Sequence, residues 1–122
     1  MGKLVLTVDD SKTMRDMLRL ALVDAGHTVV QADDGQHGVE VLEANPNVDV
    51  IVTDINMPRM DGYAFIEHVR NETPQRSVPI LVLTTESEPA KKQRAREAGA
   101  TGWIVKPFDP QKLNAAIARV AP

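Results

Sequence analysis

Cysteine is missing from this 122-residue sequence, and aromatic residues are scarce. The absence of thiols excludes both a disulfide framework and a thiolate-ligated metal site, and it is typical of proteins in a reducing compartment. Long hydrophobic runs are also missing. No segment approaches the ~20 apolar residues that span a bilayer, and the run from Leu4 to Val8 is too short for the core of a signal peptide. We therefore expect a cytoplasmic protein with no membrane partner.

Charge of one sign does not dominate the sequence either. The formal net charge is −3, and the 14 Lys and Arg residues form no stripe with interleaved aromatics, so nucleic acid is not an expected ligand. The length is that of about one domain. We therefore assign residues 1–122 to a single domain without an output domain, expect it to be a monomer, and expect any output to come from contacts of its surface.

What the sequence does contain is an alternation of short aliphatic runs with longer segments of helical periodicity. This alternation predicts an α/β fold, in which helices cover both faces of a parallel sheet. The expected strands are Lys3–Asp9, His27–Ala32, Asp49–Asp54, Pro79–Thr84 and Gly102–Val105. The expected helices run from Ser11 to before Gly26, over Gly35–Glu43, around Phe65–Val69, over Glu88–Ala98 and over Asp109–Val120. The fourth helix has few large apolar residues, so we expect it to be weakly anchored.

Polar side chains stand at the ends of four expected strands. Asp9 and Asp10 close the first, Asp54 the third, Thr84 the fourth, and Lys106 follows the fifth, which we expect to be buried. The carboxyl ends of parallel strands meet at one edge of the sheet, where ligands bind. Carboxylates ~4 Å apart at an effective dielectric of ~20 repel by roughly 4 kcal/mol per pair, unless a cation is present or a pKa rises. Mg²⁺ suits such a site because it prefers oxygen ligands.

Lys106 and Thr84 extend the chemistry of this edge. An ammonium held charged by carboxylates is no nucleophile, but it can bind an anionic oxygen, and a threonine hydroxyl offers a neutral donor. A divalent cation, an ammonium and a hydroxyl around a carboxylate indicate phosphoryl transfer with that carboxylate as the acceptor. Each residue alone also has a structural explanation, because aspartates after strands are common in solvated turns and helix caps.

The segments VDDSKTMR, TDINMPRMDG, LVLTTE and GATGWIVKPF carry a resemblance that covers essentially the whole chain. In this order and at these spacings they resemble the response-regulator receiver domains, and within that family the single-domain regulators of chemotaxis. The resemblance implies a flavodoxin-like, doubly wound, five-stranded parallel sheet of order 2-1-3-4-5 flanked by five helices. It also implies a phosphorylation-activated switch of a two-component system, which catalyses only its own phosphorylation and dephosphorylation and is not otherwise an enzyme.

The resemblance also implies a role for each acidic residue. Asp54 would be the phosphoacceptor, attacking the phosphohistidine of a histidine kinase of the chemotaxis type. Asp10, Asp54 and the backbone carbonyl of Asn56 would bind Mg²⁺, and Asp9 would hold one of the water molecules of the metal.

The remaining residues of the resemblance concern activation. Lys106 would bind phosphoryl oxygens and precede a cis peptide bond to Pro107, and Thr84 would be drawn toward the phosphoryl group. The family usually carries Tyr or Phe where this chain has Trp103, and Ala or Gly where it has Thr85. Trp103 would turn inward on activation from an outward resting position, or else simply pack as the only indole. Thr85 would narrow access to the phosphoryl group.

Activation would change the surface of the fourth helix, fifth strand and fifth helix, which includes Lys91, Lys92, Trp103 and Lys112. The partner of this output surface stays open. A flagellar motor switch protein is one alternative, a target outside chemotaxis is another, and a phosphate-sink role toward the kinase is a third. The basic residues between Lys91 and Arg96 are explained most simply as a solvated helix face.

Three other functions fit the sequence less well. An aspartyl phosphohydrolase of the haloacid dehalogenase type uses similar residues, but its acidic pair comes last in the chain, it wants an acid where Asn56 stands, and it usually needs a cap domain. A flavodoxin needs a glycine- and hydroxyl-rich phosphate loop where this chain has the acidic DDSKTM. A phosphorylation-independent interaction module would have lost site residues that are all present here.

Overall fold

A computed structural model of the chain describes residues 2–85 and 89–122. Within these residues the elements are β1 (Leu4–Val8), α1 (Lys12–Asp24), β2 (Thr28–Ala32), α2 (Gly35–Ala44), β3 (Val50–Thr53), α3 (Gly62–Glu72), β4 (Ile80–Thr84), α4 (Pro89–Ala98), β5 (Gly102–Val105) and α5 (Pro110–Val120). The strands form one parallel sheet of order β2-β1-β3-β4-β5. The predicted fold class and strand order are confirmed. Among the described helices, none is both long and apolar enough to cross a membrane.

Capping side chains begin four of the helices. Ser11 accepts a hydrogen bond from the Met14 amide at the start of α1, and aspartates do the same at the start of α2, α3 and α5. These contacts satisfy amide groups that the first helical turn leaves without a partner. The expected boundaries differ from the observed ones by only one or two residues, except for α3, which was expected only around Phe65–Val69 and runs from Gly62 to Glu72. Glu88, the expected first residue of the fourth helix, lies outside the described residues, and α4 begins at Pro89.

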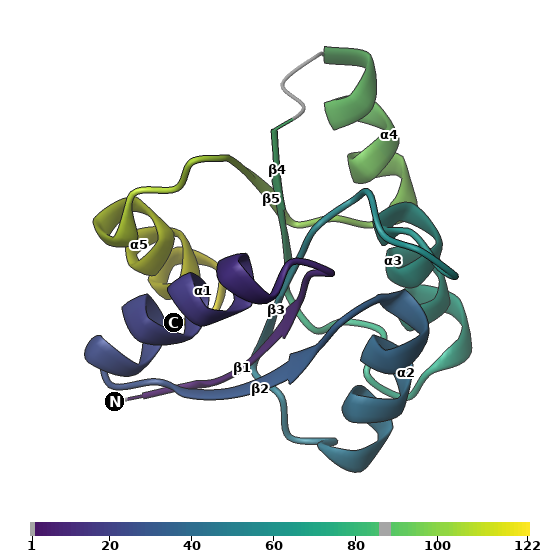
Figure 1. Cartoon of the computed structure of the whole chain (residues 1–122). Helices are drawn as coiled ribbons and strands as arrows, with labels where there is room; N and C mark the ends of the chain where they lie inside the picture. The colour runs from purple at the N-terminus through teal and green to yellow at the C-terminus, as the bar shows by residue number, and fades with distance from the viewer. Residues whose placement is uncertain (1, 86–88) are drawn as a thin grey trace.

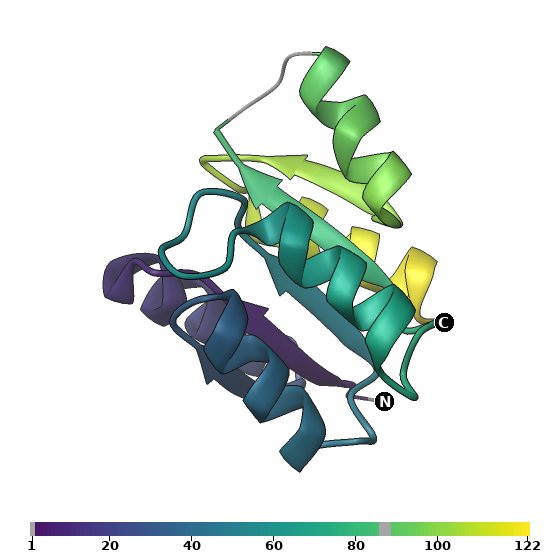
Figure 2. The same ribbon diagram turned by 90° about the vertical axis from the view of Figure 1, so that its right-hand side faces the viewer.

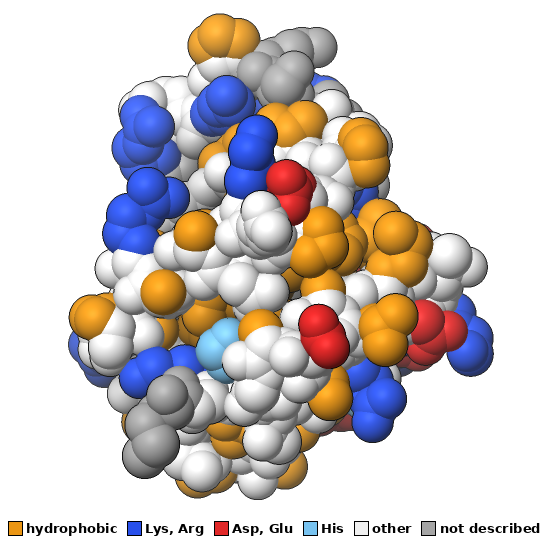
Figure 3. Space-filling model, turned by 90° about the vertical axis from the view of Figure 1, so that its left-hand side faces the viewer, with side chains coloured by type: hydrophobic (Ala, Val, Ile, Leu, Met, Phe, Trp, Pro, Cys, Tyr) orange, Lys and Arg blue, Asp and Glu red, His pale blue; other side chains and the backbone are white. Residues whose placement is uncertain are grey.

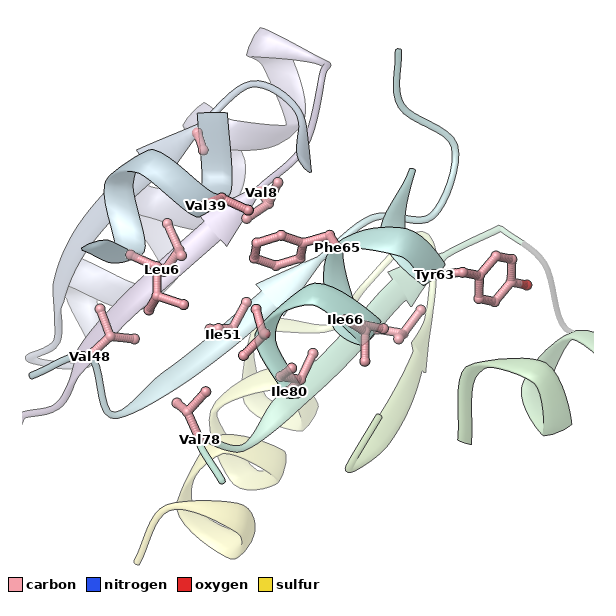
Figure 4. Close-up of a cluster of buried hydrophobic side chains, with 14 of the residues drawn as sticks. Leu6, Val8, Val39, Val48, Ile51, Tyr63, Phe65, Ile66, Val78 and Ile80 are labelled. Atoms are coloured by element: carbon pink, nitrogen blue, oxygen red, sulfur yellow. The ribbon is translucent and has the colours of Figure 1, made fainter. Parts of the chain in front are cut away.

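The sheet divides the interior into two apolar layers. Helices α1 and α5 cover one face, and α2, α3 and α4 cover the other (Figures 1 and 2). On the second face, the fully buried Phe65 of α3 points toward Val8 of β1 and Val39 of α2 (Figure 4). On the first face, leucines and an isoleucine of α1 and α5 form a separate cluster: Leu18, Leu22, Leu113 and Ile117. Strands β3 and β4 are buried at every position because both of their faces are covered.

The last strand is less buried than the sequence suggested. Strand β5 forms the edge of the sheet, so Gly102, Trp103 and Ile104 are only half-buried and Val105 is 42% exposed. The expectation that Lys106 follows a buried strand was therefore wrong. Helix α4, packed beside this edge, buries only Ala95 among its described residues, in line with the weak anchoring that we expected.

Candidate functional site

The three aspartates expected at the sheet edge lie together. Asp9 and Asp10 follow β1, Asp54 follows the neighbouring β3, and one carboxylate oxygen from each falls within a group spanning 4.8 Å. Asp9 is 1% exposed and Asp54 8% exposed, whereas Asp10 is exposed. The parallel pairing of β1 with β3 causes this meeting, because it aligns Val8 with Thr53 and so brings the residues after them side by side.

Lys106 reaches into this acidic group from the end of β5. Its ammonium nitrogen lies 3.1 Å from Asp9 Oδ2 and 3.4 Å from Asp54 Oδ2, and its side chain is only 14% exposed. The peptide bond from Lys106 to Pro107 is cis, as the family resemblance implied. The backbone amide of Lys106 donates to the Thr84 carbonyl oxygen at 2.8 Å, which ties this residue to the end of β4.

Asp54 keeps an unfavourable environment for a charged carboxylate despite this ammonium. Burial raises the pKa of the Asp54 carboxyl above its ordinary value, and the neighbouring Asp9 carboxylate raises it further. Lys106 and the hydrogen bond from the Ile55 amide act in the opposite direction without cancelling the rise. An additional cation beside Asp54 would therefore stabilise the ionised, nucleophilic form.

Backbone contacts fix the orientation of both buried carboxylates. Oδ1 of Asp9 accepts a hydrogen bond from the Ser11 amide at 2.9 Å, and Oδ1 of Asp54 accepts one from the Ile55 amide at 2.8 Å. The Asp54 amide donates to the Val8 carbonyl oxygen at 2.9 Å. Each aspartate thus directs its Oδ2 atom toward Lys106.

The donor set of this site fits Mg²⁺. Three clustered carboxylates supply hard oxygen ligands, and in the described part of the chain one ammonium, that of Lys106, pairs with them, which leaves the group with excess negative charge. Asn56, whose carbonyl we expected to add a ligand, lies exposed in the loop two residues after Asp54. The residues present therefore offer what a divalent cation requires.

Thr84 and Trp103 occupy neighbouring strands beyond this acidic group. Thr84 is 1% exposed at the end of β4, and Thr85, after it, is exposed. Trp103 pairs with Val82 across β4 and β5, is half-buried, and packs against the core beneath α3 and α4. Its indole Nε1 is buried and finds no hydrogen-bond acceptor among residues 2–85 and 89–122. The ring is thus already partly turned in, rather than fully outward.

Trp103 also connects the parts of the expected output surface. It lines a pocket with Lys92 and Ala95 on the α4 side, and a second pocket with Lys112 on the α5 side. Lys91 is half-buried and Lys112 is exposed. On another side of the molecule, α1 carries three exposed hydrophobic residues, Met17, Leu20 and Val23. Figure 3 faces α1 and α5 and shows hydrophobic side chains at this surface among scattered charges.

Two arginines make contacts that were not predicted from the sequence, one beside Asp9 and one at the start of α2. The guanidinium of Arg15 donates to the Asp9 carbonyl oxygen at 2.7 Å, and Arg59, in the loop after β3, contacts Asp34 at the start of α2. Arg15 follows the capping Ser11 by four residues, so its place near the start of α1 was a usable signal. Arg59 and Asp34 are 25 residues apart, and no local pattern predicts their contact.

Comparisons of sequence and structure place this chain among proteins of one family. Residues 5–118 match the response regulator receiver domain family. A chemotaxis protein CheY homolog of Campylobacter jejuni is 40% identical over 111 residues, which cover 90% of this chain and 85% of that protein. The structure of chemotaxis protein CheY4 of Vibrio cholerae has a TM-score of 0.92 and 43% identity, with 98% of this chain and 99% of that chain covered.

A further solved structure contains a metal. The receiver domain of sensor histidine kinase PA1611 of Pseudomonas aeruginosa, with a magnesium ion coordinated in its active site cleft, has a TM-score of 0.90 and 26% identity over 99% of this chain and 98% of that chain. The family match covers nearly all of the present chain, and the acidic group, Lys106 and the cis peptide bond after it lie at the carboxyl ends of the strands. This chain belongs to the response regulator receiver domain family and is a phosphorylation-activated switch of two-component signalling.

Proposed function

We propose that Asp54 is the phosphoacceptor of this switch and that a phosphorylated histidine kinase is its donor. The observation that carries this proposal is the position of Asp54, which is buried beside Asp9 and in contact with the Lys106 ammonium. A carboxylate oxygen of Asp54 attacks the phosphorus of a phosphohistidine. The bond between phosphorus and the imidazole nitrogen breaks, its electron pair stays on the imidazole, and an aspartyl phosphate forms.

The surrounding residues stabilise the charge of the transferred group. Asp10, Asp54 and the Asn56 carbonyl would hold Mg²⁺, with Asp9 acting through a water molecule, and the ion would offset the negative charge on the phosphoryl oxygens. Lys106 lies close enough to Asp54 to bind an oxygen of the phosphoryl group once that group is attached to the Asp54 carboxylate. The Thr84 hydroxyl, at the end of the adjacent β4, would donate to another.

A movement of Thr84 toward the phosphoryl group would carry the signal to the output surface. If Thr84 shifts toward the phosphoryl group, the space behind it becomes available to Trp103 on β5. Trp103 lines pockets with both Lys92 and Lys112, so its rotation changes a surface shared by α4, β5 and α5. Phosphorylation at one edge of the sheet then alters the affinity of that face for a partner.

We place this switch in chemotaxis, with a kinase of the chemotaxis type as donor and a flagellar motor switch protein as target. The support is the likeness to chemotaxis proteins of Campylobacter jejuni and Vibrio cholerae over 90% or more of the chain. Immobilised protein with and without beryllofluoride, a phosphoryl mimic, should bind purified motor switch protein more tightly when the mimic is present. Equal binding in both states would remove the motor from the proposal and leave the phosphate-sink role or a target outside chemotaxis.

Phosphorylation itself is tested with Mg²⁺ and acetyl phosphate as a small phosphodonor. Intact-mass measurement should show one added phosphoryl group, and chelation of Mg²⁺ should abolish it. The Asp10→Ala variant should need far more Mg²⁺ for the same labelling, because it loses a hard oxygen ligand. Labelling of the Asp54→Asn variant at the wild-type rate would contradict the assignment of the acceptor.

A further inference from the structure

An ion pair joins the loop after the proposed acceptor to the start of a different helix. The Arg59 Nε atom lies 2.6 Å from Asp34 Oδ2, while Asp34 Oδ1 accepts the hydrogen bond from the His37 amide that caps α2. The Asp34 carboxylate is 5% exposed, whereas the Arg59 side chain is 64% exposed. Arg59 and the His37 amide hold the pKa of Asp34 below its ordinary value even though burial opposes them. The buried Asp34 carboxylate thus both caps α2 and binds Arg59 in the loop after β3.

The loop that contains Arg59 has an unusual backbone at this residue. Arg59 has a φ of 66°, the only positive φ of a non-glycine residue in the described parts of the chain. A side chain with a Cβ atom adopts this left-handed conformation at a cost, so surrounding contacts must hold it there. The ion pair with Asp34 is such a contact, since it attaches the Arg59 side chain to a buried, helix-capping group.

Backbone contacts on both sides of Arg59 complete the attachment. The Gly35 amide, next to Asp34, donates to the Met60 carbonyl oxygen at 3.1 Å. A Cβ atom on Gly35 would collide with that oxygen, so only glycine permits the approach. At the end of the loop, the Gly62 amide donates to the Ile55 carbonyl oxygen at 2.8 Å. Residues 55–62 therefore form a closed loop that is fastened to α2 in its middle.

We infer that the Asp34–Arg59 ion pair is a positioning device for the metal site. Asn56, whose carbonyl is a proposed Mg²⁺ ligand, lies in this loop three residues before Arg59. Neither Asp34 nor Arg59 belongs to the acidic group of Asp9, Asp10 and Asp54, so they act through the shape of the loop. This inference rests on the Mg²⁺ site of the proposed function and adds to it the element that sets the place of one ligand.

Simple electrostatics predicts the opposite result for one variant, which makes the inference testable. Arg59 carries a positive charge near a cation site, so its removal should strengthen Mg²⁺ binding if only long-range charge mattered. If the ion pair positions the loop, removal of Arg59 weakens Mg²⁺ binding instead. Removal of both charged partners leaves the net charge unchanged, so any loss of affinity in that double variant comes from position and not from charge.

The test is calorimetric titration of the full chain with Mg²⁺. The variants are Arg59→Gln, Asp34→Asn, which keeps a good capping residue, and the double variant. We expect each to raise the Kd for Mg²⁺ by roughly fivefold, below the usual effect of a residue that supports a metal ligand because Arg59 is largely exposed. The double variant should bind Mg²⁺ no more weakly than whichever single variant has the higher Kd, since the single and double variants all lose the same contact. Arg59→Lys should stay within about twofold of wild type, because its ammonium can still form the single contact with the Asp34 carboxylate.

A matched control comes from another ion pair of the same molecule. Lys12 and Asp16 on α1 are in contact at 2.8 Å but are 81% and 59% exposed, so Lys12→Gln should leave the Mg²⁺ affinity unchanged or slightly raise it. Circular dichroism in the absence of metal checks that every variant is folded. Wild-type Mg²⁺ affinity in Arg59→Gln and in the double variant would overturn this inference but leave the proposed metal site intact. Failure of wild type to bind Mg²⁺, or unchanged binding by Asp10→Ala, would overturn the proposed metal site as well.

Discussion

Asp9 and Lys106 stand 97 residues apart in the chain, yet the Lys106 ammonium lies 3.1 Å from the Asp9 carboxylate, and both side chains are largely buried. The contact joins the end of β1 to the end of β5, two strands that are not neighbours in the sheet. It also places an ammonium where two buried carboxylates would otherwise face each other without compensation. The pair therefore serves the stability of the site as well as its proposed chemistry.

Replacement of Lys106 should be costly at neutral pH. Lys106→Met leaves Asp9 and Asp54 buried without their ammonium, so we expect the free energy of unfolding at pH 7 to fall by about 3 kcal/mol. In acid the loss should shrink, because Asp54, whose pKa is raised by burial, becomes neutral and no longer needs a counter-charge. Urea unfolding in a chelator at pH 7 and at low pH measures both effects. The exposed control Lys12→Met should cost less than about 0.5 kcal/mol, and a similar loss in both variants would contradict the role of Lys106.

The raised pKa of Asp54 predicts a stabilising substitution. A carboxyl with a folded-state pKa above its unfolded value binds protons more readily when folded, so its contribution to stability falls as the pH rises through the window between the two values. Asp54→Asn removes this penalty and keeps an acceptor for the Ile55 amide. In metal-free buffer at pH 7 we expect its Tm to rise by roughly 3–5 °C.

The same variant should lose its advantage in acid. Below the unfolded pKa, Asp54 is neutral in both states, so the Tm values of wild type and Asp54→Asn should converge there. Thermal unfolding followed by circular dichroism from neutral to acidic pH gives the comparison. A Tm difference that is independent of pH would show that the Asp54 charge is not its source.

Arg70 offers a change in stability without a change in chemistry. Its guanidinium donates to the carbonyl oxygens of Gly99, Arg76 and Val78. These residues precede β4 and β5, at the amino ends of the strands, whereas Asp54 lies at the carboxyl ends. Arg70→Met leaves these acceptors unsatisfied, and we expect a loss of about 2 kcal/mol in urea unfolding. Labelling by acetyl phosphate, measured well below the unfolding transition, should keep the wild-type rate. A slower rate would show that contacts at the amino ends of the strands influence phosphorylation at their carboxyl ends.

Activation should change the environment of Trp103. The half-buried ring can still lose exposed area, and even ~60 Å² of further burial at ~25 cal/mol per Å² is worth ~1.5 kcal/mol, enough to shift a two-state equilibrium about tenfold. Because Trp103 is the only indole, its quenching by acrylamide should decrease on addition of Mg²⁺ and beryllofluoride. Mg²⁺ alone is the control, and Thr84→Ala should reduce the change. Equal quenching in both states would remove Trp103 from the switch.

The sequence predicted the fold and the acidic site well, for physical reasons that are visible in the structure. Strands β3 and β4 are buried on both faces, so their sequences are almost continuously apolar and end abruptly at Asp54 and Thr84. Parallel pairing then forces the strand ends together, which makes the meeting of Asp9 with Asp54 predictable from topology alone. The side chains of Ser11 and Asp109 likewise marked helix starts within a residue.

Other features could not be predicted, because they depend on contacts between distant segments. The exposure of Val105 follows from the edge position of β5, and a short apolar run does not reveal whether its strand lies at an edge or in the centre. The contact of Arg59 with Asp34 occurs in a loop where Arg59 has a positive φ. An arginine at that position does not predict a positive φ. The half-buried position of Trp103 involves core residues from distant segments, among them Ala95 of α4.

The most direct test of the account is chemical mapping of the phosphoryl group. After reaction with Mg²⁺ and acetyl phosphate, borohydride reduces an aspartyl phosphate to homoserine, which peptide mass spectrometry distinguishes from unreacted aspartate. We predict homoserine at position 54 in place of Asp54, with Asp9 and Asp10 unchanged, and no conversion in a chelator. Homoserine at position 9 or 10, or labelling that leaves Asp54 intact, would contradict the assignment of Asp54 as the acceptor.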